Sequence, residues 1–293
     1  MLSADCMGCL MHREVEATRE IADEQARAAY IREVARCLAQ AGPDTTAPAL
    51  LSDLRALYRA AFQVEDRFEG CKRRFNALLL DQQETLRARL RQAADPLAAA
   101  LLMARAGNYI DFGALGDVEP QQLTALLEGA LSEGLPQEEL ERLRWELGRA
   151  RRLVYLTDNC GEIVLDKLCL EVLQKLYPDL ELTVLVRGAP VLNDATMEDA
   201  RQVGLTPAFT VLPNGADIAG TDLARICPEA RKAVMAADVI LSKGQGNFET
   251  LQGSGLNIYY LFLCKCDWFV RRFHLPKLQG AFVNERRFDV SPA

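Results

Sequence analysis

The second half of the chain contains four short and uninterrupted apolar runs, at residues 153–156, 182–186, 209–212 and 239–241. Runs of this length are typical of strands that are covered on both faces. Segments with helical patterning separate most of them, at 163–176, about 196–203 and 228–237. Strands that alternate with helices predict an α/β fold, in which a mostly parallel sheet has helices on both sides. Residues 254–266 and 278–283 should add elements of undecided type.

The first half of the chain has a different pattern. Up to about residue 150, apolar side chains recur at three- and four-residue spacings, and few β-branched clusters appear. We expect helices at 14–41, 49–62, 68–94 and 96–106, and two more that end at 149. The sequence therefore predicts two domains, a helical bundle or cap at 1–150 and an α/β domain at 151–293.

Polar residues follow the predicted strands at the points where they end. Asp158 and Asn159 follow the first strand, and Asn193 and Asp194 lie after the second. The fourth strand is followed by Lys243, Gly244, Gln245, Gly246 and Asn247. Because the carboxyl ends of parallel strands share one edge of a sheet, we expect these residues to converge on one crevice, where ligands bind in such folds.

The residue types in this crevice indicate phosphoryl chemistry. Asp158, Asn159 and Asp194 supply two carboxylates and an amide oxygen, which are ligands that hard cations such as Mg²⁺ or Mn²⁺ prefer. Without a cation, two neighbouring carboxylates would repel each other. Lys243 and the glycine-flanked amides of residues 244–247 are suited to binding phosphate.

Other interpretations of the same residues remain open. Asp158 with Asn159, and Asn193 with Asp194, are also common turn or helix-capping pairs. The sequence GQGN resembles part of a dinucleotide-binding motif, although Glu249 stands in place of its third glycine. A non-catalytic metabolite-binding protein, or a Rossmann-type transferase, could use the same crevice.

Composition excludes some classes of partner. The formal net charge of −7 argues against sequence-independent nucleic-acid binding, which needs a basic surface. No window approaches the ~18 apolar residues of a membrane span. Charged residues appear within the first five positions, so we expect no secretory signal and a cytoplasmic protein with reduced thiols. Oligomeric state is undecided.

Nine cysteines include two close pairs, Cys6 with Cys9 and Cys264 with Cys266. Four thiolates could form a structural zinc site, but a C-x-C pair is not the usual second half of one. Buried and reduced thiols near the domain junction are the alternative interpretation.

Several ordered motifs resemble those of the damage-control phosphatases, formerly the family called domain of unknown function 89. The motifs are DNCGEIVLD, RGAPVLNDATMEDA, NGADIAGTDL, SKGQGNFE and the pair Lys265-Cys266, with DCMGC and AGNYIDFG in the first half. The last two resemble the single-domain microbial branch. The resemblance implies a helical N-terminal domain packed on a Rossmann-like α/β/α sandwich. It also implies a metal-dependent phosphatase that acts on small phosphorylated metabolites, either sugar phosphates or damaged metabolites.

The resemblance also implies roles for individual residues. The metal ligands of the family correspond to Asp158, Asn159 and Asp194, and the ion would be Mn²⁺, Mg²⁺, Co²⁺ or Ni²⁺. Its substrate loop corresponds to 243–247, which lacks the Arg-Thr-x-Lys form of the sugar-phosphate branch. Either water or Asp158 could be the nucleophile. Further candidates for substrate contacts are Asn193, Glu249 and Lys265, together with Asn108 and Asp111, for which helix capping is the alternative.

Overall fold

A six-stranded sheet forms the centre of the protein in a computed structural model, which describes residues 2–63, 68–109, 129 and 131–288. The strand order is β3-β2-β1-β4-β5-β6. The first five strands in this order are parallel, and only β6 runs antiparallel to its neighbour β5. The strands are β1 (Arg152–Leu156), β2 (Glu181–Val186), β3 (Thr210–Pro213), β4 (Val239–Lys243), β5 (Ile258–Leu263) and β6 (Gly280–Asn284).

This sheet confirms the predicted α/β fold with a mostly parallel sheet. The two segments of undecided type contain β5 and β6, respectively. The chain builds outward from β1 to β3 on one side and, after β3, crosses back to place β4 on the other side of β1. The ends of β1 and β4 therefore flank the point where the strand order reverses, which is where open α/β sheets bind ligands.

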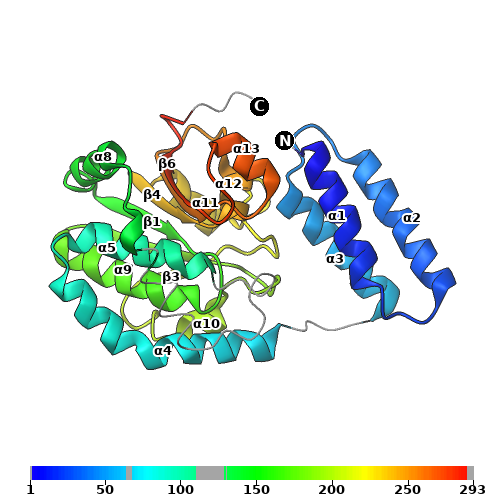
Figure 1. Ribbon diagram of the computed structural model, residues 1–293, viewed down its shortest axis with the longest axis horizontal. Coiled ribbons are helices and arrows are strands. Elements are labelled where there is room, and N and C mark those ends of the chain that lie inside the picture. Colours follow the sequence, from blue (N-terminus) through cyan, green and yellow to red (C-terminus); the bar gives the residue numbers. More distant parts are fainter. Residues whose placement is uncertain (1, 64–67, 110–128, 130, 289–293) are drawn as a thin grey trace.

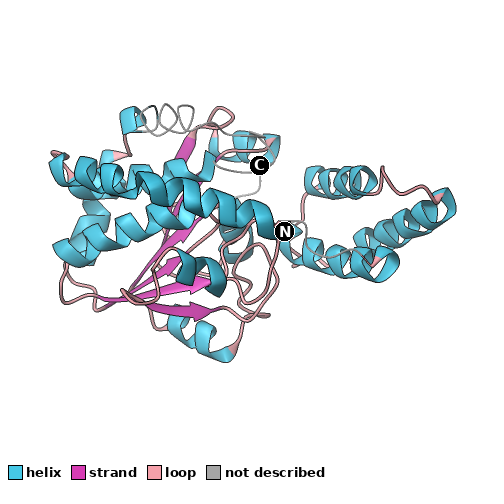
Figure 2. Ribbon diagram, turned by 90° about the horizontal axis from the view of Figure 1, so that it is seen from below, coloured by secondary structure: helices cyan, strands magenta, loops and turns pink. Residues whose placement is uncertain are grey.

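Helices cover both faces of the sheet (Figure 2). Side chains alternate along β1, so Leu153 and Tyr155 lie in one hydrophobic core, while Val154 and Leu156 lie in another. The first core includes α4 (Glu69–Gln92), α5 (Pro96–Ala106), α8 (Gln137–Leu147), α9 (Glu162–Leu176) and α10 (Met197–Gln202). The second includes α11 (Pro228–Met235), α12 (Gln245–Leu251) and α13 (Asp267–Phe273).

Three N-terminal helices form a bundle at one end of the molecule (Figure 1). They are α1 (Ala4–Ala17), α2 (Glu24–Gln40) and α3 (Ala47–Phe62), and they share a separate core. The single helix predicted over 14–41 is wrong, because the chain turns between α1 and α2. Thr18 ends α1, and the carboxylate of Asp23 accepts a hydrogen bond from Ala26 N to begin α2.

Hydrophobic packing does not divide the chain at residue 150. The sheet begins close to the predicted boundary, at Arg152, but α4, α5 and α8 pack with the sheet rather than with the α1–α3 bundle. α4 and α5 pack against α9, and α8 packs against β6, all of which come later in the chain. One of the two helices predicted before residue 149 is α8, and the other falls outside the described residues. No helix in the described ranges is long and apolar enough to cross a membrane.

Candidate functional site

A cleft with a volume of about 600 Å³ lies between the α1–α3 bundle and the carboxyl ends of β1 and β4. The bundle contributes an apolar wall with one cation, formed by Leu10, Arg13, Ala47, Pro48 and Leu51. The opposite wall holds most of the predicted site residues, namely Asp158, Asn159, Asn193, Asp194, Gln245, Gly246, Glu249 and Lys265. The predicted convergence of strand-end residues is therefore present.

The backbone holds the segments after β1 and β2 together. Asn159 and Asp194 form an antiparallel bridge, and Ala195 N donates to Asp158 O at 2.7 Å. Cys160 N donates to Asn193 O at 2.8 Å. The carboxylates of Asp158 and Asp194 are thus fixed near each other by main-chain contacts, although the residues are 36 positions apart.

Gly244 allows the carboxylate of Asp158 to lie against the end of β4. Its φ is +78°, a conformation that glycine adopts without strain. A Cβ atom at this position would lie only 2.0 Å from Asp158 Oδ2. The residues after Gly244 are not the loop that the glycine-rich sequence predicted, since α12 begins at Gln245.

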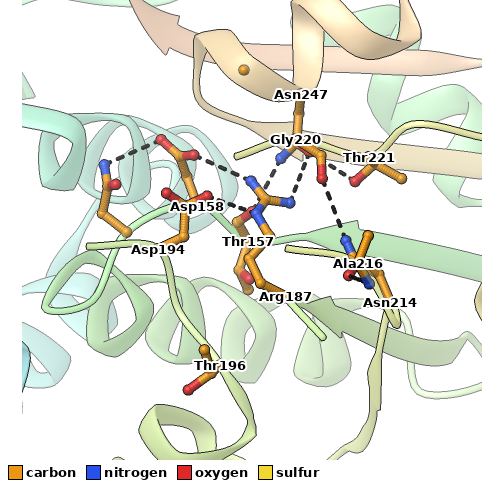
Figure 3. A network of polar contacts seen from close by, with 12 residues as sticks. Thr157, Asp158, Arg187, Asp194, Thr196, Asn214, Ala216, Gly220, Thr221 and Asn247 are labelled. Carbon is orange, nitrogen blue, oxygen red and sulfur yellow. Dashed lines mark hydrogen bonds and ion pairs between the residues drawn. The ribbon is translucent and has the colours of Figure 1, made fainter. Parts of the chain in front are cut away.

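Arg187 joins the two acidic residues and was missed by sequence reasoning (Figure 3). Its guanidinium donates to Asp194 Oδ2 at 2.6 Å, to Asp158 Oδ1 at 3.4 Å and to Asn247 Oδ1 at 3.1 Å. The amide nitrogen of Asn247 donates to the main-chain oxygens of Thr157 and Lys243. Asn247 thus holds Arg187 and the ends of β1 and β4 in place. It was predicted to contact the substrate, but it is not among the residues that line the cleft.

The electrostatic balance at Asp158 is unfavourable to its negative charge. Burial raises the pKa of this carboxyl well above its usual value, and the charges of Asp194 and Glu162 raise it further. Arg187 and Lys265 act in the opposite direction but do not cancel the shift. An added cation would favour the ionised form.

The donor set at this position fits a hard divalent cation. Asp158 and Asp194 provide carboxylate oxygens, and the amide of Asn159 lies beside them at the cleft. The set contains only two carboxylates, and the described part of the chain holds no cluster of three or more His, Cys, Asp or Glu with metal-binding geometry. A bound ion would therefore rely on the amide and on water for its other ligands.

Lys243 does not line the cleft, so the prediction that it contacts phosphate is not supported by this geometry. Its side chain is fully buried, and its ammonium donates to Ala104 O at 2.7 Å, to Asp166 Oδ1 at 2.8 Å and to Glu162. Burial alone would lower the pKa of Lys243, but the Asp166 and Glu162 carboxylates raise it above its usual value. Glu162 and Asp166 are four residues apart and therefore lie on one face of α9. In the sequence, this spacing could have indicated that the two carboxylates share a buried cation.

Amide groups supply hydrogen-bond donors at the cleft instead. Asn193 Nδ2 and Gln245 Nε2 are buried and have no hydrogen-bond partner in the described ranges. Both residues line the cleft. Buried donors without partners are costly, and the oxygens of a bound anion would satisfy them.

Asn108, Asp111 and Glu249 are the remaining residues that the sequence predicted for the site. Asn108 lies in a 3₁₀ turn, η1 (Gly107–Tyr109), and donates to Asp158 Oδ2 at 2.9 Å. It therefore contacts Asp158 from the first half of the chain but is not among the residues that line the cleft. Asp111 lies outside the described residues. Glu249 lines the cleft, and burial raises its pKa from 4.5 to about 7.

All nine cysteines are free thiols. Cys160 and Cys169 are buried, whereas Cys9 and Cys266 are exposed. The pairs Cys6 with Cys9 and Cys264 with Cys266 do not form a metal-binding cluster within the described ranges.

Known proteins are similar to this chain in both sequence and fold. The model of the damage-control phosphatase ARMT1-like domain matches residues 2–278. A damage-control phosphatase of Pyrococcus horikoshii is 30% identical over 95% of this chain and 96% of its own length. A damage-control phosphatase of Archaeoglobus fulgidus is 31% identical over 91% of this chain and 93% of its own. A crystal structure of a DUF89 family protein from Pyrococcus horikoshii superposes with a TM-score of 0.82, at 27% identity, and covers 97% of this chain and 98% of that one.

Proposed function

The chain belongs to the damage-control phosphatase family with the ARMT1-like domain, and we propose that it is a metal-dependent phosphatase of small phosphorylated metabolites. Its substrates would be sugar phosphates or damaged phosphometabolites. Relatives that cover nearly the whole chain are named as damage-control phosphatases, which supports the reaction class.

The observation that carries this proposal is the position of Asp158, Asn159 and Asp194. All three line one cleft at the reversal point of the sheet, and the cleft is large enough for a phosphorylated metabolite. Grouping buried carboxylates is costly, as the raised pKa of Asp158 indicates. A site that binds a cation would offset that cost.

The three residues would hold the metal ion, and the ion would polarise the phosphoryl group and neutralise its developing charge. Arg187 orients both carboxylates by donating to each of them. The unpartnered amide donors of Asn193 and Gln245 would bind the phosphoryl oxygens. Lys265 adds positive charge on the same wall of the cleft.

The α1–α3 bundle would contact the part of the substrate beyond the phosphate. Leu10, Leu51 and Pro48 present apolar surface to the cleft, and Arg13 adds a cation at the same wall. This wall excludes water from one side of the bound ester. Specificity would then depend on residues of the bundle and not only on the strand ends.

Hydrolysis of a generic aryl phosphate tests the proposal. The chelated protein should be inactive, and one or more of Mn²⁺, Mg²⁺, Co²⁺ and Ni²⁺ should restore turnover. Asp158→Asn keeps the size of the side chain but removes its charge, so turnover should fall by about a thousand-fold, since metal activation is worth several kcal/mol. Full activity of chelated protein would refute metal dependence. Tight binding of phosphometabolites without turnover would favour the metabolite-binding alternative.

A further inference from the structure

Glu162 connects the buried ion cluster to the asparagines of the proposed metal site. It lies in the first turn of α9 and is fully buried. Its Oε2 accepts from Asn108 Nδ2 at 3.1 Å and from Asn159 Nδ2 at 3.3 Å. Its Oε1 accepts from the ammonium of Lys243. One carboxylate therefore touches two amides on one side and one cation on the other.

These contacts determine which way the amide of Asn159 faces. Its Nδ2 has two hydrogens, and they are directed to Glu162 Oε2 and to Asp158 Oδ2, the latter at 3.1 Å. Both carboxylate oxygens accept from the same amide nitrogen, so the nitrogen side of the Asn159 amide faces them. The oxygen of Asn159 is left to face the cleft, which the residue lines.

Lys243 holds the carboxylate of Glu162 in place. An ammonium has three hydrogens, and Lys243 directs them to Ala104 O, Glu162 and Asp166. Without this cation, Glu162 would be an uncompensated charge in a fully buried position. Neighbouring atoms pack closely around the side chain of Glu162, since a Cβ atom on Gly107 would lie only 2.8 Å from Glu162 Cγ.

We propose that Glu162, held by Lys243, is a positioning residue that orients the amide of Asn159 so that its oxygen faces the metal ion. Neither Glu162 nor Lys243 touches the ion or the substrate. This inference rests on the proposed function, since it assigns the orientation of one ligand of the same site. Loss of Glu162 would let the amide rotate and present its NH₂ group to the cation.

The chain offers a matched control at Asp166. Glu162→Gln and Asp166→Asn each replace a buried carboxylate that binds Lys243 with an amide of the same shape, and each removes one negative charge. Only Glu162 contacts the asparagines, whereas Asp166 accepts from Tyr155. The two variants should therefore share any loss of stability but differ in metal binding.

Calorimetric titration of the chelated proteins with Mn²⁺ measures this difference. Glu162→Gln should weaken Mn²⁺ binding by about 10- to 100-fold, the usual effect of losing a residue that orients a metal ligand. Asp166→Asn should stay within about threefold of the unmodified protein. Equal losses in the two variants would overturn the inference, while leaving the proposed function intact. Failure of the unmodified protein to bind any of the four divalent cations would overturn both.

A charge-swapped variant keeps the test decisive if Glu162→Gln folds poorly. Glu162→Gln combined with Asn159→Asp restores the net charge of the pair, and the new Gln can donate to the new Asp. A carboxylate presents an oxygen in either orientation, so Mn²⁺ affinity should return to within about tenfold of the unmodified protein. An affinity more than tenfold weaker than that of the unmodified protein, or no binding by the folded swap variant, would contradict the inference.

Discussion

Gly244→Ala would place a methyl group where the carboxylate of Asp158 now lies. The new Cβ would be 2.0 Å from Oδ2, 2.2 Å from Cγ and 2.6 Å from Oδ1 of Asp158. Real Cβ contacts are at least 3.0 Å, so Oδ2 must retreat by at least 1.0 Å, which is 3.0 minus 2.0. Because Cγ is also in contact, rotation about χ2 alone does not relieve the overlap, and the whole carboxylate of Asp158 must move away from the end of β4.

The structure separates two costs of this substitution. The backbone at Gly244 has a φ of +78° and a ψ of 160°, a region that is essentially confined to glycine, so a residue with a Cβ there costs roughly 1–3 kcal/mol. Displacement of Asp158 is the second cost, and a misplacement of about 1 Å in a reacting site can reduce the rate about 100-fold. Gly253→Ala is the control, because Gly253 has a φ of +82° and open space where its Cβ would be.

Denaturant unfolding, Mn²⁺ titration and phosphatase kinetics on both variants provide the assay. Both should lose roughly 1–3 kcal/mol of unfolding free energy from the positive φ of the backbone alone. Only Gly244→Ala should lose about 100-fold or more in kcat/KM and bind Mn²⁺ more weakly. A folded Gly244→Ala protein with the same kcat/KM as Gly253→Ala would refute the role assigned to the position of Asp158.

Three further outcomes follow from the geometry. Lys243→Ala leaves two buried carboxylates without their cation, so the free energy of unfolding should fall by about 3–5 kcal/mol; a change below 1 kcal/mol in chemical denaturation would contradict the buried cluster. Glu249 has a pKa raised from 4.5 to about 7, so the folded state binds the extra proton and stability should fall as pH rises through that window. Glu249→Gln should remove this pH dependence in thermal unfolding, and an unchanged slope would contradict it. Arg13 lines the cleft and forms no ion pair with the described part of the chain, so Arg13→Ala should raise KM by roughly tenfold for an anionic metabolite with kcat unchanged; an unchanged KM across a panel of such metabolites would argue against a substrate contact.

Much of the sheet was predictable because buried parallel strands leave a simple pattern. The runs that became β1, β2 and β4 are short, apolar and followed by polar residues. Parallel strands share one carboxyl edge, and this geometric rule was sufficient to bring Asp158 and Asp194 together. The α1–α3 bundle was expected only as part of a larger helical half, since helical spacing does not say which core a helix joins.

Side-chain partners were much harder to predict than backbone positions. Lys243 follows a strand and precedes a glycine, which are the features of a phosphate-binding lysine. Its partners Glu162 and Asp166 come from a helix 77 or more residues earlier in the chain. Arg187 is the first residue of the RGAPVLNDATMEDA motif, but a single arginine after a strand occurs in many loops, and nothing local in the sequence indicates that it pairs with Asp158 and Asp194. These long-range ion pairs depend on how α9 packs against β4, which local patterning does not encode.

Anomalous diffraction at the manganese absorption edge, from a crystal soaked in Mn²⁺, would locate the proposed metal ion. We expect one strong anomalous peak within coordination distance of carboxylate oxygens of Asp158 and Asp194 and of the side-chain oxygen of Asn159. A peak elsewhere in the molecule, or none at these residues in crystals of protein that hydrolyses phosphate esters with Mn²⁺, would contradict it.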